Sequence, residues 1–146
     1  MKRVVVVCLI CLMWWPAETF ILADRVGEPN ARSFFLFSTP AGQYAVRHDG
    51  MGEFTSPKGM RRVFNLRVGP GARIENVYYL EHQEDLFLMY EVTGAVFYVV
   101  RMEQTKRKLR WSTELRDVTD APVIDGDFVI VNKIQIDKTN GHVRQD

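Results

Sequence analysis

The feature that most constrains this fold is a group of short apolar runs that do not alternate with polar residues. Three of them are Leu86–Tyr90, Val96–Val100 and Phe128–Val131. A strand that is apolar on both of its faces must be covered on both sides of its sheet. The runs therefore predict a sheet stacked between two layers, supplied either by neighbouring sheets or by a partner chain.

The rest of the chain also predicts strands, because apolar runs alternate with turn residues and no long stretch has a helical period. One strand is expected to be half exposed: in Lys106–Trp111, Leu109 and Trp111 share one face and the charged residues share the other. The expected strands are 33–38, 43–47, 62–68, 74–80, 86–92, 96–102, 108–112, 128–132 and 134–137.

Length and charge limit the possible classes of protein. The 146 residues, 47% hydrophobic and 25% charged, are typical of one globular domain. The formal net charge is +1, from 19 basic and 18 acidic residues, so no overall field favours nucleic acid. A nucleic-acid partner is therefore not expected.

The N-terminal segment has the anatomy of a secretory signal. Lys2 and Arg3 precede the apolar stretch 4–15, and the small residue Ala23 follows at a suitable cleavage position. We expect residues 1–23 to be a signal peptide, or an anchor if they are retained, and residues 24–146 to be a single β domain. Both alternatives predict a protein that is secreted or held in the periplasm or cell envelope, with membrane contact only if the segment is retained.

The C-terminal half contains a weak internal repeat. Residues 102–110 align with 136–144, which places Thr105 on Thr139, and residues 85–89 align with 127–131. The first alignment has an offset of 34 residues and the second an offset of 42. Repeats of about 40 residues with four strands each are typical of propeller blades.

The residues of this repeat resemble a known family. Residues 109–115 contain Trp111 at the end of a strand, residues 121–131 supply a Pro-Val strand, an Asp-Gly turn and an apolar strand, and residues 134–143 supply an Asp-x-x-x-Gly hairpin. This order is similar to a blade of the quinoprotein-like (PQQ-repeat) β-propellers. The resemblance covers about residues 85–146, with blade-like units at about 73–115 and 121–146, and Arg107 and Gln145 depart from the family pattern.

The resemblance implies an all-β fold, an antiparallel meander of propeller-type blades. Residues 24–146 have room for about three blades, whereas closed propellers need about four or more. The chain is therefore too short for a closed propeller, and open strand edges favour self-association or a protein partner. A small β-sandwich or barrel is the alternative fold.

Catalytic, cofactor-binding and metal-binding residues are not expected. The three histidines His48, His82 and His142 lie in separate segments, away from metal-ligand spacing. Asp137–Gly141 is better explained as a hairpin turn than as a calcium loop. The family resemblance does not imply quinone chemistry either, because in that family the cofactor-binding residues are spread over a complete propeller.

A possible interaction surface is formed by the residues Lys106, Lys108, Arg110 and Trp111, and a charged sheet edge is its alternative explanation. The numerous aromatic residues at strand spacing are expected in the core rather than on a carbohydrate platform. We therefore expect an exported, non-enzymatic interaction or scaffold module. The alternatives are a carbohydrate- or small-ligand-binding domain and a remnant or partial quinoprotein-type enzyme subunit.

Overall fold

A computed structural model describes residues 20–30, 32, 34–106 and 108–144. Their regular secondary structure consists of strands, arranged in three antiparallel sheets that do not form a closed propeller. The predicted all-β fold is therefore confirmed. Among the described residues, no helix is long and apolar enough to cross a membrane.

Each sheet contains a meander of consecutive strands. The first sheet has the order β3-β4-β5-β6, the middle sheet β10-β9-β8-β7-β2, and the third sheet β1-β11-β12-β13. The bounds are β1 Phe20–Leu22, β2 Asp24–Arg25, β3 Phe34–Thr39, β4 Gly42–Arg47, β5 Met51–Thr55, β6 Arg61–Asn65, β7 Ile74–His82, β8 Asp85–Val92, β9 Val96–Glu103, β10 Lys108–Arg116, β11 Val123–Asp125, β12 Phe128–Val131 and β13 Ile134–Asp137.

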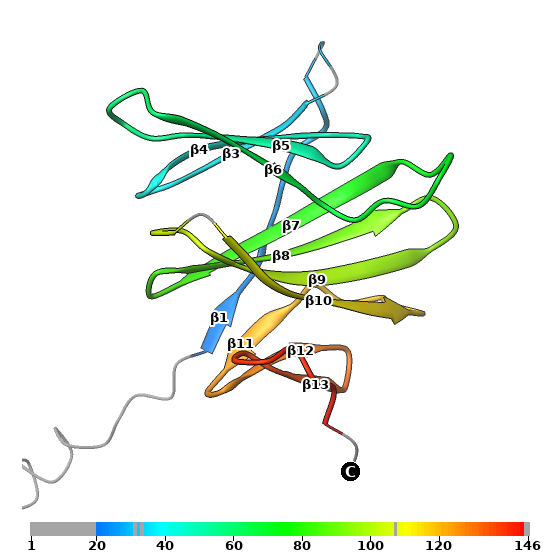
Figure 1. Cartoon of the computed structure of the whole chain (residues 1–146). Coiled ribbons are helices and arrows are strands. Elements are labelled where there is room, and N and C mark those ends of the chain that lie inside the picture. The colour runs from blue at the N-terminus through cyan, green and yellow to red at the C-terminus, as the bar shows by residue number, and fades with distance from the viewer. Residues whose placement is uncertain (1–19, 31, 33, 107, 145–146) are drawn as a thin grey trace, which may run out of the picture.

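The three sheets lie one on another as layers, with the first sheet at the top of Figure 1 and the third at the bottom. The N-terminal strands link all three layers. Strand β1 pairs with β11 in the third sheet, β2 pairs with β7 in the middle sheet, and the chain then enters the first sheet at β3. A segment of about twenty residues thus holds both ends of the stack together.

The layering explains the apolar runs of the middle sheet. Leu86 and Leu88 on β8 pack into a core shared with the first sheet, whereas Phe87 and Met89 on the same strand pack into a second core shared with the third sheet. Each of these four side chains is at most 3% exposed. The chain itself covers both faces of this sheet, so no partner is needed there.

The run Phe128–Val131 behaves differently, because it lies in the last layer. Val129 and Val131 are fully buried against the middle sheet, but Phe128 and Ile130 point to the other side and are half-buried. The expectation of cover on both faces is thus met on one face only. The chain provides no further layer below β12 among its described residues.

The expected face-sharing of Leu109 and Trp111 is wrong. A bulge between these two residues shifts the register of β10 against β9. Leu109 consequently packs against the core shared with the first sheet, and Trp111 against the core shared with the third. Simple alternation cannot reveal a bulge, because one extra residue reverses the facing of everything beyond it.

Strands β1, β2 and β5 were not among the expected strands, and β11 was expected only as the Pro-Val strand of the family resemblance. In β5, Gly52 reads as part of a turn, yet its lack of a side chain makes room for the Phe64 ring of β6 directly opposite. Strand β1 falls within the expected signal segment 1–23. Residues 1–19 of that segment lie outside the described residues, and Phe20–Leu22 form the edge of the third sheet.

Candidate functional site

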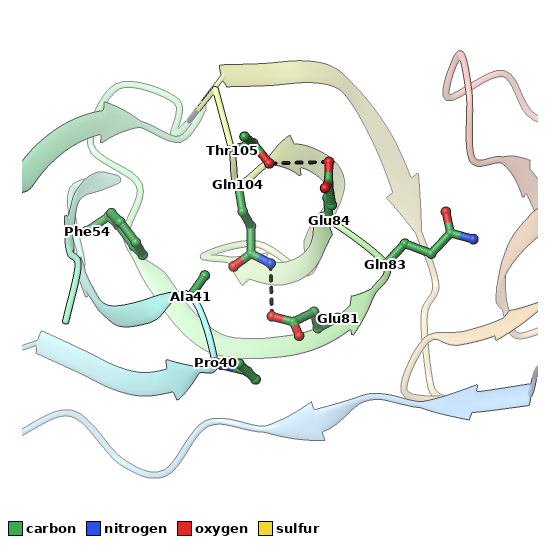
Figure 2. Close-up of a pocket in the computed structure, with 8 residues that line it drawn as sticks. All are labelled: Pro40, Ala41, Phe54, Glu81, Gln83, Glu84, Gln104 and Thr105. Atoms are coloured by element: carbon green, nitrogen blue, oxygen red, sulfur yellow. Dashed lines mark hydrogen bonds between the residues drawn. The ribbon is translucent and has the colours of Figure 1, made fainter.

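A cleft of about 480 Å³ opens between the first and middle sheets, at the turns that follow β3, β7 and β9. Figure 2 shows its walls: Pro40, Ala41 and Phe54 come from the first sheet, and Glu81 and Gln104 come from the middle sheet and its β9–β10 turn. One wall is thus mainly apolar and the other carries hydrogen-bonding groups.

Gln104 closes the bottom of this cleft and ties the two sheets together. The Tyr44 and Thr39 hydroxyls donate to its Oε1 over 2.7 and 3.0 Å, and its Nε2 donates to Glu81 Oε2 over 2.9 Å. Gln104 is only 7% exposed, so these bonds compensate for its burial. Because its amide oxygen and nitrogen both have partners, the network fits a structural role.

A second cleft, of about 240 Å³, lies between the middle and third sheets at the same rim. Arg101 Nη2 pairs with Asp85 Oδ2 at 3.0 Å, while Nη1 donates to the backbone carbonyls of Lys138 and Thr139 at 3.2 and 3.3 Å. This arginine fastens the C-terminal hairpin of the third sheet to β9. Both terminal nitrogens of the guanidinium thus have partners within the protein, whereas its Nε is buried without a hydrogen-bond partner among the described residues.

His82 lines the same cleft, and its Nε2 is buried without a hydrogen-bond partner among the described residues. Burial lowers the pKa of His82, the Lys138 charge lowers it further, and Asp85 opposes both effects. A neutral histidine beside an ion pair can accept a proton, but no nucleophile or metal ligand set accompanies it among the residues that line the cleft.

The structure does not bring the predicted surface residues Lys106, Lys108, Arg110 and Trp111 together as one free patch. Arg110 Nε donates to Glu103 Oε2 over 2.7 Å, and Lys106 Nζ lies 3.5 Å from Glu103 Oε1. These contacts, with the Arg110 hydrogen bond first, lower the pKa of Glu103. Lys108 is exposed.

Trp111 is part of the packing between layers. Its Nε1 donates to the Lys138 carbonyl over 2.9 Å, and Gly141 lies against the indole ring so closely that a Cβ there would be 2.5 Å from it. Thr113 Oγ1 also donates to the Gly141 carbonyl, over 2.5 Å. Trp111 is therefore half-buried and holds the third sheet onto β10.

Basic residues follow the outer edge strands of two sheets. Arg61 and Arg62 lie on β6, the edge of the first sheet, and Lys108 and Arg110 lie on β10, the edge of the middle sheet. Charged side chains on an edge strand oppose the addition of another strand. These two edges are thus poor places for a partner to extend the sheet.

Across the described part of the chain, no group of three or more His, Cys, Asp or Glu side chains could hold a metal ion. His48 Nδ1 lies 2.7 Å from the Ile74 carbonyl oxygen, and its ring makes an edge contact with Phe35. His48 is far in sequence from His82 and His142. The Asp137 carboxylate accepts from the backbone N–H groups of Thr139 and Asn140, which makes it a turn-stabilising residue.

The face of the first sheet that points away from the middle sheet is uncovered, and we call it the first-sheet end face. Leu36, Ala45, Glu53 and Val63 form one cross-strand row on it, with Leu36 54% and Val63 66% exposed. A groove of about 110 Å³ lies beside this row. It is lined by Phe34, Arg47, Met51, Gly52, Glu53 and Val63.

The opposite end of the stack, the third-sheet end face, has a matching row. Leu22, Val123, Ile130 and Gln135 are cross-strand neighbours, and Leu22 is 66% exposed. In the next row Asp125 lies between Phe20, which is exposed, and Phe128, which is half-buried. The central carbon of the Arg144 guanidinium lies 5.6 Å from the centroid of the Phe128 ring.

Most large exposed apolar side chains of the described residues gather on these two end faces. The residues are Phe20 and Leu22 on the third sheet and Leu36, Met51 and Val63 on the first sheet; Met60 and Val143 lie elsewhere. The sequence does not reveal these two apolar faces, because they can be recognised only when the layer order and the strand register are known.

Comparison with known proteins identified no relative. No protein-family model matches the sequence, and neither the curated proteins nor the solved structures contain a significant match.

Proposed function

We propose that this protein is a non-enzymatic protein–protein interaction or scaffold module, built from blades of the PQQ-repeat type and exported from the cytoplasm. The observation that supports it best is the concentration of exposed apolar side chains on the two end faces of the stack. Contiguous apolar patches on a protein surface mark sites of association. The two clefts at the rim, in contrast, are spanned by the protein's own hydrogen bonds.

The proposed docking surfaces are the end faces rather than the strand edges. The edge strands β6 and β10 carry basic side chains, whereas the end faces carry apolar rows flanked by single charges. An apolar centre with a polar border is the usual composition of an interface.

The proposed blade identity has topological support. Each of the three sheets contains consecutive strands in meander order, β3–β6, β7–β10 and β11–β13, and successive sheets stack face to face. The N-terminal strands β2 and β1 complete the middle and third sheets. The proposed export rests on the sequence alone, on Lys2, Arg3 and the apolar stretch that follows. Fractionation of cells that express the full chain tests it, since recovery with cytoplasmic markers would contradict it.

A pull-down from an envelope extract tests the interaction. Wild-type protein is expected to retain a partner, Val63→Asp to lose it, and Lys108→Glu to keep it, because only Val63 lies on an end face. A wild-type protein that stays monomeric and retains nothing contradicts the proposal. So does a quinone or calcium ion that co-purifies with the chain and is required for a measurable reaction.

A further inference from the structure

We infer that the edge strand β3 of the first sheet binds an extended, uncharged segment of a partner protein, which joins this sheet as a further strand. The inference goes beyond the proposed function, because it concerns a strand edge and not an end face. The charges on β6 and β10 make those two edges poor docking sites, and β3 differs from both of them.

Strand β3 lacks the features with which proteins protect a sheet edge. Its six residues, Phe34–Thr39, contain no charge and no proline. Its pairing with β4 continues from one end of the strand to the other without a bulge. Among the described residues, the other uncharged edge strand is β1, which has three residues. A long, regular and uncharged edge is a template for the addition of a strand.

The hydrogen bonds of Phe34 show which backbone groups of β3 point away from β4. The Phe34 N–H donates to Asn30 Oδ1 over 3.0 Å, and the Phe34 carbonyl accepts from the Asn30 N–H over 2.9 Å. Both backbone groups of Phe34 thus point outward. Because this pattern alternates along an antiparallel pair, the N–H and C=O groups of Leu36 and Ser38 point outward as well.

The outward groups of Leu36 and Ser38 have no hydrogen-bond partner in the part of the chain that the structure describes. Both residues are exposed. The edge therefore presents free donors and acceptors to solvent at the spacing of a strand. An extended backbone offers the complementary groups at the same spacing, which identifies the occupant as a strand.

The side chains of β3 favour an apolar segment. Each residue of an added strand lies beside the β3 residue opposite it, on the same face of the sheet. One neighbour is Leu36, which is 54% exposed on the first-sheet end face. The next is Phe37, which is buried and stacks on the Tyr79 ring with centroids 4.5 Å apart. A β-branched residue pairs well with such neighbours, whereas a charge beside Phe37 would lose its hydration.

Strand β3 is also held in place before any partner binds. Phe35 is 2% exposed in the core shared with the middle sheet, and Thr39 Oγ1 donates to Gln104 Oε1 over 3.0 Å. A strand that is already ordered loses little conformational entropy when a segment pairs with it.

Amide hydrogen exchange, followed by NMR on the full-length chain, tests the inference with the synthetic peptide Thr-Val-Thr-Val-Thr-Val as the probe. In the free protein, the amides of Leu36 and Ser38 are expected to exchange fast, and those of Phe35 and Phe37, which bond to β4, slowly. Peptide at up to about 1 mM is expected to slow exchange at Leu36 and Ser38 at least about fivefold. Phe35 and Phe37 are expected to stay unchanged.

Ser38→Pro blocks the edge, because it removes an outward N–H and places the proline ring where the added strand would lie. Proline is tolerated on an edge strand where the N–H faces solvent. Ser38→Pro is expected to abolish the protection of Leu36 by the peptide, and the matched control Ser38→Ala, which keeps the N–H, to retain it. Slow exchange at Phe35 and Phe37 shows that each variant is folded.

A second pair of variants leaves the backbone unchanged. Ser38→Lys places a charge on the edge and is expected to weaken peptide binding, whereas Gln43→Lys, opposite Ser38 on the inner strand β4, is expected to retain it.

The inference is overturned if the peptide protects neither outward amide, if it protects Leu36 equally in folded Ser38→Pro, or if Ser38→Lys binds the peptide like the wild type. Outward amides that are already protected in the dilute free protein overturn it as well. Protection that arises without peptide as the protein concentration increases would identify a second copy as the occupant and would overturn the partner segment.

Discussion

Gln104 is the buried polar side chain on which the joint between the first and middle sheets depends. Replacing it by alanine leaves the Glu81 carboxylate without its amide donor and the Tyr44 and Thr39 hydroxyls without their acceptor. We expect Gln104→Ala to lower the free energy of unfolding by about 1–3 kcal/mol, measured by urea denaturation. Gln43→Ala, at an exposed position on β4, is expected to change it by less than about 0.5 kcal/mol. Equal effects of the two variants would contradict the structural role of Gln104.

Gly141 has two separate reasons to be a glycine. Its φ of 73° lies in the left-handed region, and a Cβ would contact the Trp111 ring. Gly126 has a φ of 58° but open space around it. We expect Gly126→Ala to cost about 1 kcal/mol from backbone strain alone, and Gly141→Ala to cost at least about 2 kcal/mol from strain plus overpacking. Thermal unfolding of the two variants checks this order, and a reversed order would refute the contact between hairpin and indole.

His82 makes stability depend on pH. Burial holds the pKa of His82 in the folded protein below its ordinary value of 6.5, so unfolding between the two pKa values takes up a proton. The contribution of neutral His82 is therefore complete above about pH 6.5 and declines as the pH falls through that value. We expect His82→Gln to flatten the change in urea midpoint between pH 7.5 and 5.5, whereas His142→Gln, at an exposed position, retains it. A wild-type midpoint that rises on acidification through this window would contradict the burial of His82.

At the scale of elements, strand β1 completes the third sheet with alternating side chains. Ile21 faces the core, and Leu22 faces solvent on the third-sheet end face. We expect Ile21→Ala to lower the free energy of unfolding by about 1–2 kcal/mol, since this side chain is only partly buried, and Leu22→Ala to change it by less than about 0.5 kcal/mol. Denaturation of protein expressed from the full chain measures both. Two equally small effects would show that the working domain does not use β1.

Sequence reasoning predicted the elements whose residues carry an unambiguous pattern. The doubly apolar strands β8 and β9 were expected, because burial on both faces leaves no polar positions. Strand β5 was missed because Gly52 is explained only by the Phe64 ring on the neighbouring strand. The prediction that Leu109 and Trp111 share a face was wrong, because the bulge in β10 arises from its pairing with β9.

At the scale of the whole molecule, the two end faces exist because the first and third sheets are the outer layers of the stack. Length and repeat spacing predicted about three blades, and the three sheets agree with that number. The end faces could not be predicted, because the same apolar pattern that is buried in β8 is half uncovered in β12. Which strand ends the stack is decided by the tertiary fold.

The central claim, that a covered middle sheet separates two uncovered end faces, is tested most directly by methionine oxidation with hydrogen peroxide. Met89 and Met102 are 1% and 2% exposed in the cores, Met51 is 43% exposed on the first-sheet end face, and Met60 is 47% exposed outside it. The account predicts that, in mass spectra of the folded protein, Met89 and Met102 stay reduced while Met60 and Met51 oxidise. Early oxidation of Met89 or Met102 would contradict the stacked fold, and a Met51 that stays reduced like Met89 would contradict an uncovered first-sheet end face.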